Sequence, residues 1–335
     1  MQIESETMKM ILLLTNKDDV TVDFIVKELK RQKLQYYRLN TEDIPEIIKI
    51  DFNMDNNKFM LYDLKKEIRV DLDEIDAVYF RRAQISELNY IDNITGPEKT
   101  YLRGELAYVL EGLYKLLENK YWINNVYRIR EAENKIFQLQ LAKNIGFKIP
   151  SAIISNNVES IEAMINLHDN DCIIKPIKSG NLKRDFYSRI IFTSQIREDF
   201  MKDKDRISSF PVYVQENIHK KYDLRCIVIG TKVYCAQIDS QCYEDSKIDW
   251  RKGKRCLEHK KYNLPIDIQE KCIQLTQRLG LNYSAIDLIL DKKDQYFFLE
   301  CNPNGQWAWL EVRLGFPLSR SIVNLLKYKG EKIYD

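Results

Sequence analysis

The hydrophobic positions in the first quarter of the chain switch between strand-like runs and helical spacing. Residues 10–14 form a short apolar run typical of a buried strand, and residues 20–30 carry apolar side chains at helical spacing. Residues 35–39 and 75–80 are predicted as further strands, with a hairpin expected within residues 52–64. Strand, helix and strand in this order predict a small α/β domain with parallel pairing.

Longer helical patterns follow. Leucine and valine side chains recur at helical spacing from Pro97 to Leu117, and a proline suits the first turn of a helix. A shift of composition at residues 122–125 marks a domain boundary. The next helix is expected from Glu131 to Asn144, because Gly146 is a plausible C-cap. Two more helices are predicted at residues 268–279 and 317–328.

Short runs rich in branched and aromatic residues predict strands in the second half of the chain. Gly230-Thr231 forms the turn between two of them, and the polar run Asp291 to Asp294 forms the turn between two others. The predicted strands lie at residues 172–175, 211–218, 226–229, 233–238, 285–290 and 296–300. We therefore expect an α/β protein with α+β character.

The last predicted hairpin carries three hard oxygen ligands on one face. If its turn has four residues, Asp287 and Glu300 lie diagonally across the two strands, about 7–8 Å apart. Asn302 follows Glu300 by two positions and shares its face. A buried carboxylate is costly unless it is paired or binds a metal, and this ligand set suits Mg²⁺. A solvated face of an edge hairpin explains the pattern about as well, but the polar run at residues 302–311 favours a site wall.

Cations stand at the ends of two predicted strands. Arg81 and Arg82 follow one strand, and the carboxyl ends of strands line the ligand crevice in open α/β sheets, although adjacent arginines are usually just solvated. Lys175 ends another strand and is followed by Pro176. A lysine held in this way suits a phosphate, although most lysines at strand ends simply reach water. The loop at residues 177–180 can close over phosphates.

Further candidates lie on the strands that follow. Residues 215–218 leave a strand with free backbone groups that can pair with an adenine edge. Asp223 and Arg225 share one face of a strand, where a structural ion pair is as good an explanation as a functional one. The run from Arg251 to Lys261 holds six basic residues and one acidic residue. Such a run is usually a solvated loop, and in a phosphate-handling enzyme it can also hold a triphosphate tail or an acidic peptide.

Composition excludes several classes of function. A net charge of +2 gives no general electrostatic case for nucleic acid or a membrane. Seven cysteines without a C-x-x-C pair, and three widely spaced histidines, argue against disulfides, a zinc site and a histidine metal site. The run at residues 10–14 is too short for a signal peptide or a membrane span, so a cytoplasmic protein is expected.

The motifs resemble a known family. Asp287 followed by Glu300-x-Asn302 resembles the metal signature of ATP-grasp ligases. The longer string from Glu300 to Glu311 resembles the microviridin-type maturases, which cross-link ribosomally made precursor peptides (graspetides). The strings at residues 239–241, 249–251 and 262–265 are similar to those of the same branch.

The resemblance implies a fold, two cofactors and a set of ligands. It implies an ATP-grasp fold with a pre-ATP-grasp domain at residues 1–120, a central subdomain at 121–210 and a C-terminal subdomain at 211–335. ATP would lie between the last two, with Mg²⁺ on Asp287, Glu300 and Asn302. The implied nucleotide ligands are Lys135, Lys175, Gln215, Glu216, Asn217, Ile218, Asp223 and Arg251.

The implied reaction has two steps. A carboxylate of the peptide attacks the γ-phosphate to give an acylphosphate, and a hydroxyl or amine then displaces phosphate. Arg251 and Arg225 are the expected catalytic cations, with Arg225 holding the acidic side chain, because a guanidinium grips a carboxylate at two points. The implied partner is a precursor peptide with a leader and an acidic, Thr-rich core, and the resemblance also implies a homodimer.

Two alternatives remain open from the sequence alone. The first is a ligase of the same fold that adds amino acids to a protein tail or a small molecule. The second is a non-catalytic nucleotide-binding regulator, against which the intact Asp287, Glu300 and Asn302 argue.

Overall fold

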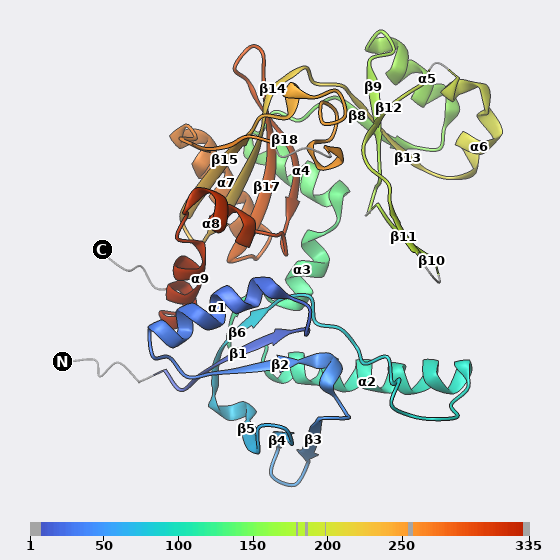
Figure 1. The fold of residues 1–335 in the computed structure, drawn as a ribbon. Helices are drawn as coiled ribbons and strands as arrows, with labels where there is room; N and C mark the ends of the chain where they lie inside the picture. The colour runs from blue at the N-terminus through green and yellow to red at the C-terminus, as the bar shows by residue number, and fades with distance from the viewer. Residues whose placement is uncertain (1–7, 179, 185–186, 198, 254–256, 331–335) are drawn as a thin grey trace. The chain divides into compact units, whose positions relative to one another are not determined.

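The computed structural model divides the chain into two compact units (Figure 1). It describes residues 8–178, 180–184, 187–197, 199–253 and 257–330. Unit 1 contains residues up to Ile129 together with 280–283 and the segment from Asn304 onward, and unit 2 contains residues 130–279 and 284–303. The division into three lobes with boundaries at residues 120 and 210 stays a prediction.

Unit 1 is built on a four-stranded parallel sheet in the order β2-β1-β6-β7. A three-stranded antiparallel sheet, β3-β4-β5, occupies the predicted hairpin region. The elements of this unit are β1 (Met10–Thr15), α1 (Val20–Arg31), β2 (Tyr36–Asn40), β3 (Ile48–Asn53), β4 (Lys58–Asp63), β5 (Ile68–Asp71), β6 (Ile75–Phe80), α2 (Gly96–Leu116), β7 (Tyr121–Ile123), α8 (Ala308–Leu314) and α9 (Leu318–Lys327).

Local sequence explains where these elements begin and end. Residues 11–15 are fully buried, as expected for a strand at the centre of a parallel sheet. Asp19 caps α1 by accepting from the Thr21 N–H at 2.9 Å. Thr95 and Glu98 form a reciprocal capping box at the start of α2, which confirms the predicted helix start near Pro97. Helix α1 packs against α9, and α9 also packs against β6 and β7 of the sheet.

Unit 2 holds two main sheets, and the short helix α3 (Val126–Ala132) leads the chain into it. One sheet has four strands in the order β12-β9-β13-β8, and the other has five in the order β16-β15-β14-β17-β18. The elements are α4 (Lys135–Ile145), β8 (Ala152–Ser155), α5 (Val158–Leu167), β9 (Cys172–Lys175), β10 (Asn181–Arg184), β11 (Tyr187–Ile190), β12 (Ser194–Gln195), α6 (Lys204–Ser209), β13 (Val212–Glu216), β14 (Lys220–Ile229), β15 (Lys232–Ile238), β16 (His259–Tyr262), α7 (Ile266–Arg278), β17 (Tyr283–Asp291) and β18 (Tyr296–Asn302).

The single helix predicted from Glu131 to Asn144 is two helices. Helix α3 ends at Ala132 and α4 begins at Lys135. Asn134 causes the break, because its side chain accepts from the Phe137 N–H at 3.2 Å and so caps a new helix. Gly146 ends α4 with φ 92°, as the sequence predicted.

The β17–β18 hairpin has a different register from the predicted one. Its turn contains three residues between Asp291 and Gln295, with Asp294 in the left-handed region at φ 57°. A β-bulge at Leu299 then places Glu300 directly opposite Asp287 rather than diagonally across from it. Without this extra residue, the two carboxylates would lie on opposite faces of the sheet.

Among the helices that the structure describes, none has the length and apolar character needed to cross a bilayer.

Candidate active site

A cavity of about 670 Å³ lies within unit 2, lined by residues of both main sheets and of α4. The lining residues that the sequence singled out are Lys135, Lys175, Gln215, Asn217, Ile218, Asp223, Arg251, Asp287, Glu300 and Asn302. Such a cluster of charged and amide side chains in one cavity is typical of a site for an anionic ligand.

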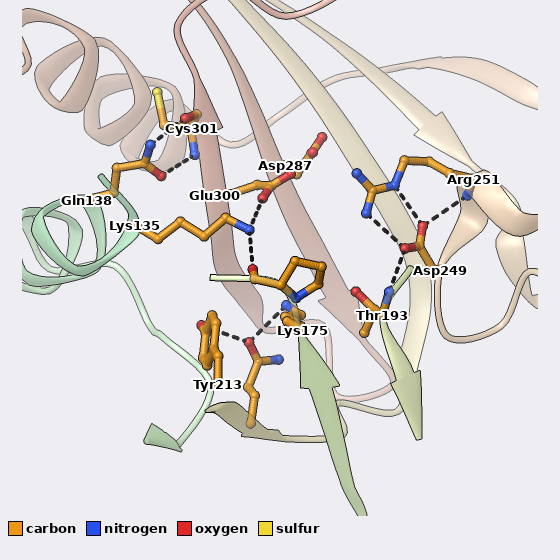
Figure 2. Close-up of polar contacts among 12 residues, drawn as sticks. Lys135, Gln138, Lys175, Thr193, Tyr213, Asp249, Arg251, Asp287, Glu300 and Cys301 are labelled. Atoms are coloured by element: carbon orange, nitrogen blue, oxygen red, sulfur yellow. Dashed lines mark hydrogen bonds and ion pairs between the residues drawn. The ribbon is translucent and has the colours of Figure 1, made fainter. Parts of the chain in front are cut away.

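Lys175 reaches the cavity from the last position of β9. Its backbone lies directly opposite Tyr213 of β13, and its ammonium donates to the Gln215 carboxamide oxygen at 2.9 Å (Figure 2). The Tyr213 hydroxyl donates to the same oxygen at 3.3 Å. Burial lowers the pKa of Lys175 to about 8. The Lys175 ammonium is therefore held in place, and it is only weakly compensated by carboxylates.

The loop after Lys175 closes against the chain that returns from the β10–β11 hairpin. The Ile191 N–H donates to the Gly180 carbonyl at 2.6 Å, and a Cβ at position 180 would lie 1.9 Å from the Ile191 carbonyl oxygen. Only glycine permits this approach. Gly180 and Ile191 both line the cavity, so the predicted phosphate loop borders the site.

Lys135 links α4 to the β17–β18 hairpin. Its ammonium lies 3.2 Å from a Glu300 carboxylate oxygen and donates to the Pro176 carbonyl at 3.0 Å (Figure 2). Burial opposes ionisation of Glu300, but Lys135, Arg251 and Lys175 together hold the pKa of that carboxyl below its usual range. Glu300 is thus an anion surrounded by three cations.

Asp287 lies opposite Glu300 and is held from its other side by Arg225. The Arg225 Nη1 donates to Asp287 Oδ1 at 2.9 Å, and both side chains are largely buried. Burial raises the pKa of Asp287, the Glu300 charge adds to this effect, and Arg225 opposes it. Two facing carboxylates with Asn302 on the same face form a donor set that fits a hard divalent cation, because the cation would relieve their repulsion.

Arg251 and Asp249 form a two-point ion pair at another wall of the cavity. The Nε and Nη2 atoms of Arg251 each donate to a carboxylate oxygen of Asp249 at 2.8 Å. Asp249 also accepts from the Thr193 N–H at 3.2 Å and so ties this basic loop to β12 (Figure 2). The Asp249-Trp-Arg251 string thus presents a fixed guanidinium to the cavity. The rest of the predicted basic run includes residues 254–256, which lie outside the described residues.

The sequence did not single out Lys220. Lys220 is buried, contacts both carboxylate oxygens of Asp223 at 2.8 and 2.9 Å, and donates to the Ile248 carbonyl at 3.2 Å. Asp223 and Lys220 both line the cavity. The sequence around Lys220 does not indicate a site residue, because its contact with the Ile248 carbonyl joins positions far apart in the chain.

Two predicted site residues point elsewhere. The carboxylate of Glu216 accepts from the Ser151 N–H at 2.7 Å and lies 3.4 Å from His168, so only its backbone remains as a hinge contact. Arg225 is not among the described lining residues, and its guanidinium binds Asp287. The structure therefore gives Arg225 a role in holding Asp287, and the expectation that it grips a substrate carboxylate stays a prediction.

Gln138, which the sequence analysis also missed, fixes β18 at Cys301. It lies one turn after Lys135, accepts from the Cys301 N–H at 3.0 Å, donates to the Cys301 carbonyl at 2.6 Å and donates to the Ala132 carbonyl. Its carboxamide thus continues the sheet's hydrogen bonding between Glu300 and Asn302 (Figure 2).

Replacing Gln138 with leucine is expected to lower the free energy of unfolding by about 1–3 kcal/mol, because it leaves buried backbone groups of Cys301 and Ala132 unpaired. Urea denaturation measures this change. The matched control is Gln269→Leu. Gln269 lies on α7 away from the cavity, and its side chain donates to the backbone carbonyl of Leu264. A Gln138→Leu protein as stable as the control variant would contradict the prediction.

Two family models match the sequence. An MvdD pre-ATP grasp domain matches residues 10–130, and a RimK-like ATP-grasp domain matches residues 132–326. A search of curated proteins found no match.

Several solved structures are similar over nearly the whole chain. A RiPP-associated ATP-grasp ligase of Chryseobacterium gregarium, in complex with ADP and a leader and core peptide, is 28% identical with a TM-score of 0.87, covering 97% of this chain and 98% of that one. The macrocyclase MdnC of Microcystis aeruginosa MRC, bound with precursor peptide MdnA, is 24% identical with a TM-score of 0.82, covering 95% and 98%. The ATP-grasp ligase PsnB, complexed with minimal precursor, Mg and ADP, is 19% identical with a TM-score of 0.74, covering 97% and 98%.

Proposed function

The chain belongs to the RimK-like ATP-grasp family, and from this we propose that it is an ATP- and Mg²⁺-dependent ligase that closes side-chain rings in a ribosomal precursor peptide. The observation that carries the proposal is the cavity of unit 2, where cations surround the opposed carboxylates Asp287 and Glu300. The similar ligase of Chryseobacterium gregarium, solved with ADP and a leader and core peptide, supports the substrate class.

The cavity offers a place for each part of ATP. Lys135, Lys175 and Arg251 supply positive charge for the phosphates, and the backbone of residues 215–218 supplies the adenine hinge. Asp223, fixed by Lys220, is the acid available to the ribose hydroxyls. Lys175 and Gln215 are joined by a hydrogen bond, so the phosphate and adenine ends of the site are positioned together.

Asp287, Glu300 and Asn302 are the residues that would hold Mg²⁺. The donor set fits, because the two carboxylates face each other across β17 and β18 and the amide lies on the same face. When bound, the metal supplies charge neutralisation for the β- and γ-phosphate oxygens. Arg225 orients Asp287 and favours its ionised form, and Lys135 does the same for Glu300.

The reaction proposed for this site is carboxylate activation followed by ring closure. A side-chain carboxylate of Asp or Glu attacks the γ-phosphorus, the bond to the bridging oxygen breaks, and ADP leaves with an acylphosphate remaining on the peptide. A hydroxyl of Ser or Thr, or an amine of Lys, then attacks the acyl carbon and loses its proton as phosphate leaves. Lys135, Lys175 and Arg251 stabilise the charge that develops on the phosphoryl oxygens. The peptide loses one water for each ring.

The proposed partner is a precursor peptide with a leader and an acidic, Thr-rich core, and a homodimer acting in the cytoplasm completes the proposal. The near-neutral net charge of +2 fits a peptide substrate better than a polyanion.

Mass spectrometry of a candidate precursor peptide incubated with the protein, ATP and Mg²⁺ tests the proposal. Losses of one water per ring, matched by equal amounts of ADP, are expected. The control peptide carries Asn and Gln in place of the core acids and should keep its mass. A gain of mass in the presence of free amino acids would instead indicate a ligase that extends a peptide. No ADP release with any acceptor would indicate a nucleotide-binding regulator.

The affinity for ADP is expected to fall as the pH rises through about 8, where free Lys175 loses its proton. Burial lowers the pKa of Lys175 to about 8, Glu300 and Asp249 oppose this effect, and Lys135 and Lys220 add to it. Bound phosphates favour the ammonium form, so binding above this pH takes up a proton and weakens by up to about tenfold per pH unit.

Calorimetric titration with ADP without Mg²⁺, from about pH 6.5 to about pH 9.5, measures this dependence. The control is Lys175→Arg, whose guanidinium stays charged over the whole range, and its affinity should lack the fall near pH 8. Identical pH profiles for the two proteins would show that Lys175 is not the titrating group.

A further inference from the structure

The parallel sheet of unit 1 has a topological switch point that the proposed nucleotide site does not use. The chain leaves β1 toward β2 on one side and returns to β6 on the other, so the strand order reverses between β1 and β6. In open α/β sheets, ligands bind beyond the carboxyl ends of the strands at this point. Arg81 and Arg82 follow the carboxyl end of β6, and Asn16 follows that of β1.

Arg81 is occupied by contacts within the protein. Its side chain is 1% exposed, its Nε lies 2.8 Å from Asp19 Oδ2, and its Nη atoms donate to the Gly305 carbonyl at 3.1 Å and to Gln306 Oε1 at 2.9 Å. Arg81 therefore holds the loop at residues 305–306, and its positive charge is balanced by the carboxylate of Asp19.

Arg82 is exposed instead. No hydrogen bond or ion pair joins its guanidinium to another side chain in the part of the chain that the structure describes. Its backbone lies in the left-handed region at φ 52°, and the Asn16 carboxamide holds it there by donating to the Arg82 carbonyl at 2.6 Å. The left-handed conformation costs a residue other than glycine about 1–2 kcal/mol, so the fold maintains this turn against strain.

The surroundings of Arg82 carry unmatched positive charge. Partial burial and the neighbouring Arg81 lower the pKa of Arg82, and Asp19, already paired with Arg81, offsets this only in part. At the end of β1, the buried hydroxyl of Thr15 has no hydrogen-bond partner among the described residues. The carboxyl ends of β1 and β6 thus carry a free guanidinium and an unsatisfied polar atom, as expected where a polar ligand binds.

We infer that Arg82, at the switch point beyond the carboxyl ends of β1 and β6, binds a side-chain carboxylate of the acidic peptide substrate. A guanidinium matches the two oxygens of a carboxylate, and the fixed turn presents it without further ordering. A nucleotide phosphate is the weaker choice, because Lys135, Lys175 and Arg251 in unit 2 already provide for phosphates. The inference rests on the proposed function for the nature of the substrate.

Fluorescence anisotropy with a fluorescein-labelled peptide of alternating Thr and Glu tests this site directly. Arg82→Ala is expected to weaken binding by about tenfold or more, and Arg82→Lys by less, because one charge remains but the fork is lost. Wild type and the two Arg82 variants should bind the matched Thr-Gln peptide with equal affinity. The control is Arg69→Ala, an arginine of the same unit that stacks on Tyr62 of the other sheet. Melting temperatures verify that the variants fold.

Three results would overturn the inference. Arg82→Ala could bind the Thr-Glu peptide as tightly as wild type, could lose affinity for both peptides equally, or could weaken ADP binding instead of peptide binding. Ring formation by wild type is measured in parallel. If wild type forms no rings but Arg82→Ala still binds the Thr-Glu peptide more weakly than wild type, the result counts against the proposed reaction. If wild type forms rings and Arg82→Ala binds that peptide as tightly as wild type, the result counts against this site alone.

Discussion

Replacing Glu300 with glutamine is expected to reduce ATP-dependent ring formation by more than about 100-fold while the protein stays folded. The Glu300 carboxylate faces Asp287 and balances Lys135 at 3.2 Å, with Arg251 and Lys175 adding to the surrounding positive charge. The neutral amide keeps the shape of the side chain but removes the charge that attracts a divalent cation. Because Glu300 lies at a cavity wall rather than in the core, we expect only a small loss of stability.

A binding measurement separates this effect from a general loss of activity. Wild type should bind ADP more tightly when Mg²⁺ is added, and Glu300→Gln should bind ADP without any gain from Mg²⁺. The control is Glu270→Gln, on the exposed face of α7, which should behave as wild type. If Glu300→Gln kept the full response to Mg²⁺, the assignment of Glu300 as a metal ligand would fail.

The position of Glu300 also shows how far the sequence leads. Alternating side chains on two adjacent strands were enough to pair Asp287 with Glu300 and Asn302 on one face. The direct opposition of the two carboxylates was not predictable, because it depends on a three-residue turn closed by Asp294 in the left-handed region and on the bulge at Leu299. Both are small backbone choices that hydrophobic patterns do not encode.

The same limit applies to the elements around the site. The apolar runs at β1 and β6 and the helical spacing of α1, α2 and α9 are strong signals, since burial on one face dominates these segments. The break between α3 and α4 is a weaker signal, because it comes from the single capping side chain of Asn134.

Among the site residues, those that the sequence missed have partners far along the chain. Gln138 bonds Cys301 and Lys220 bonds Ile248, so neither belongs to a local pattern. The contact of Arg225 with Asp287 was missed for the same reason. The sequence predicted the face that it shares with Asp223, but the carboxylate that it binds, Asp287, lies 62 residues later.

Replacing Arg225 with methionine is expected to lower the free energy of unfolding by about 3–5 kcal/mol, the usual cost of leaving one member of a buried ion pair without its partner. Arg225 is 7% exposed, and its Nη1 lies 2.9 Å from Asp287 Oδ1. Methionine fills much of the space but leaves the Asp287 carboxylate facing Glu300 without its balancing charge. Both side chains are largely buried, so solvent is a poor substitute for the lost guanidinium.

Urea denaturation of four proteins decides between this structural role and a role in substrate binding. Arg225→Met should be much less stable than wild type, and the double variant Arg225→Met, Asp287→Asn should recover part of the loss, because no charge is left unpaired between these positions. The control Lys221→Met breaks the exposed ion pair of Lys221 with Asp294, from the same strand β14, and should cost no more than about 1 kcal/mol. A guanidinium kept for the substrate alone predicts a different result. Arg225→Met would then match Lys221→Met in stability and differ only by a raised KM for the peptide.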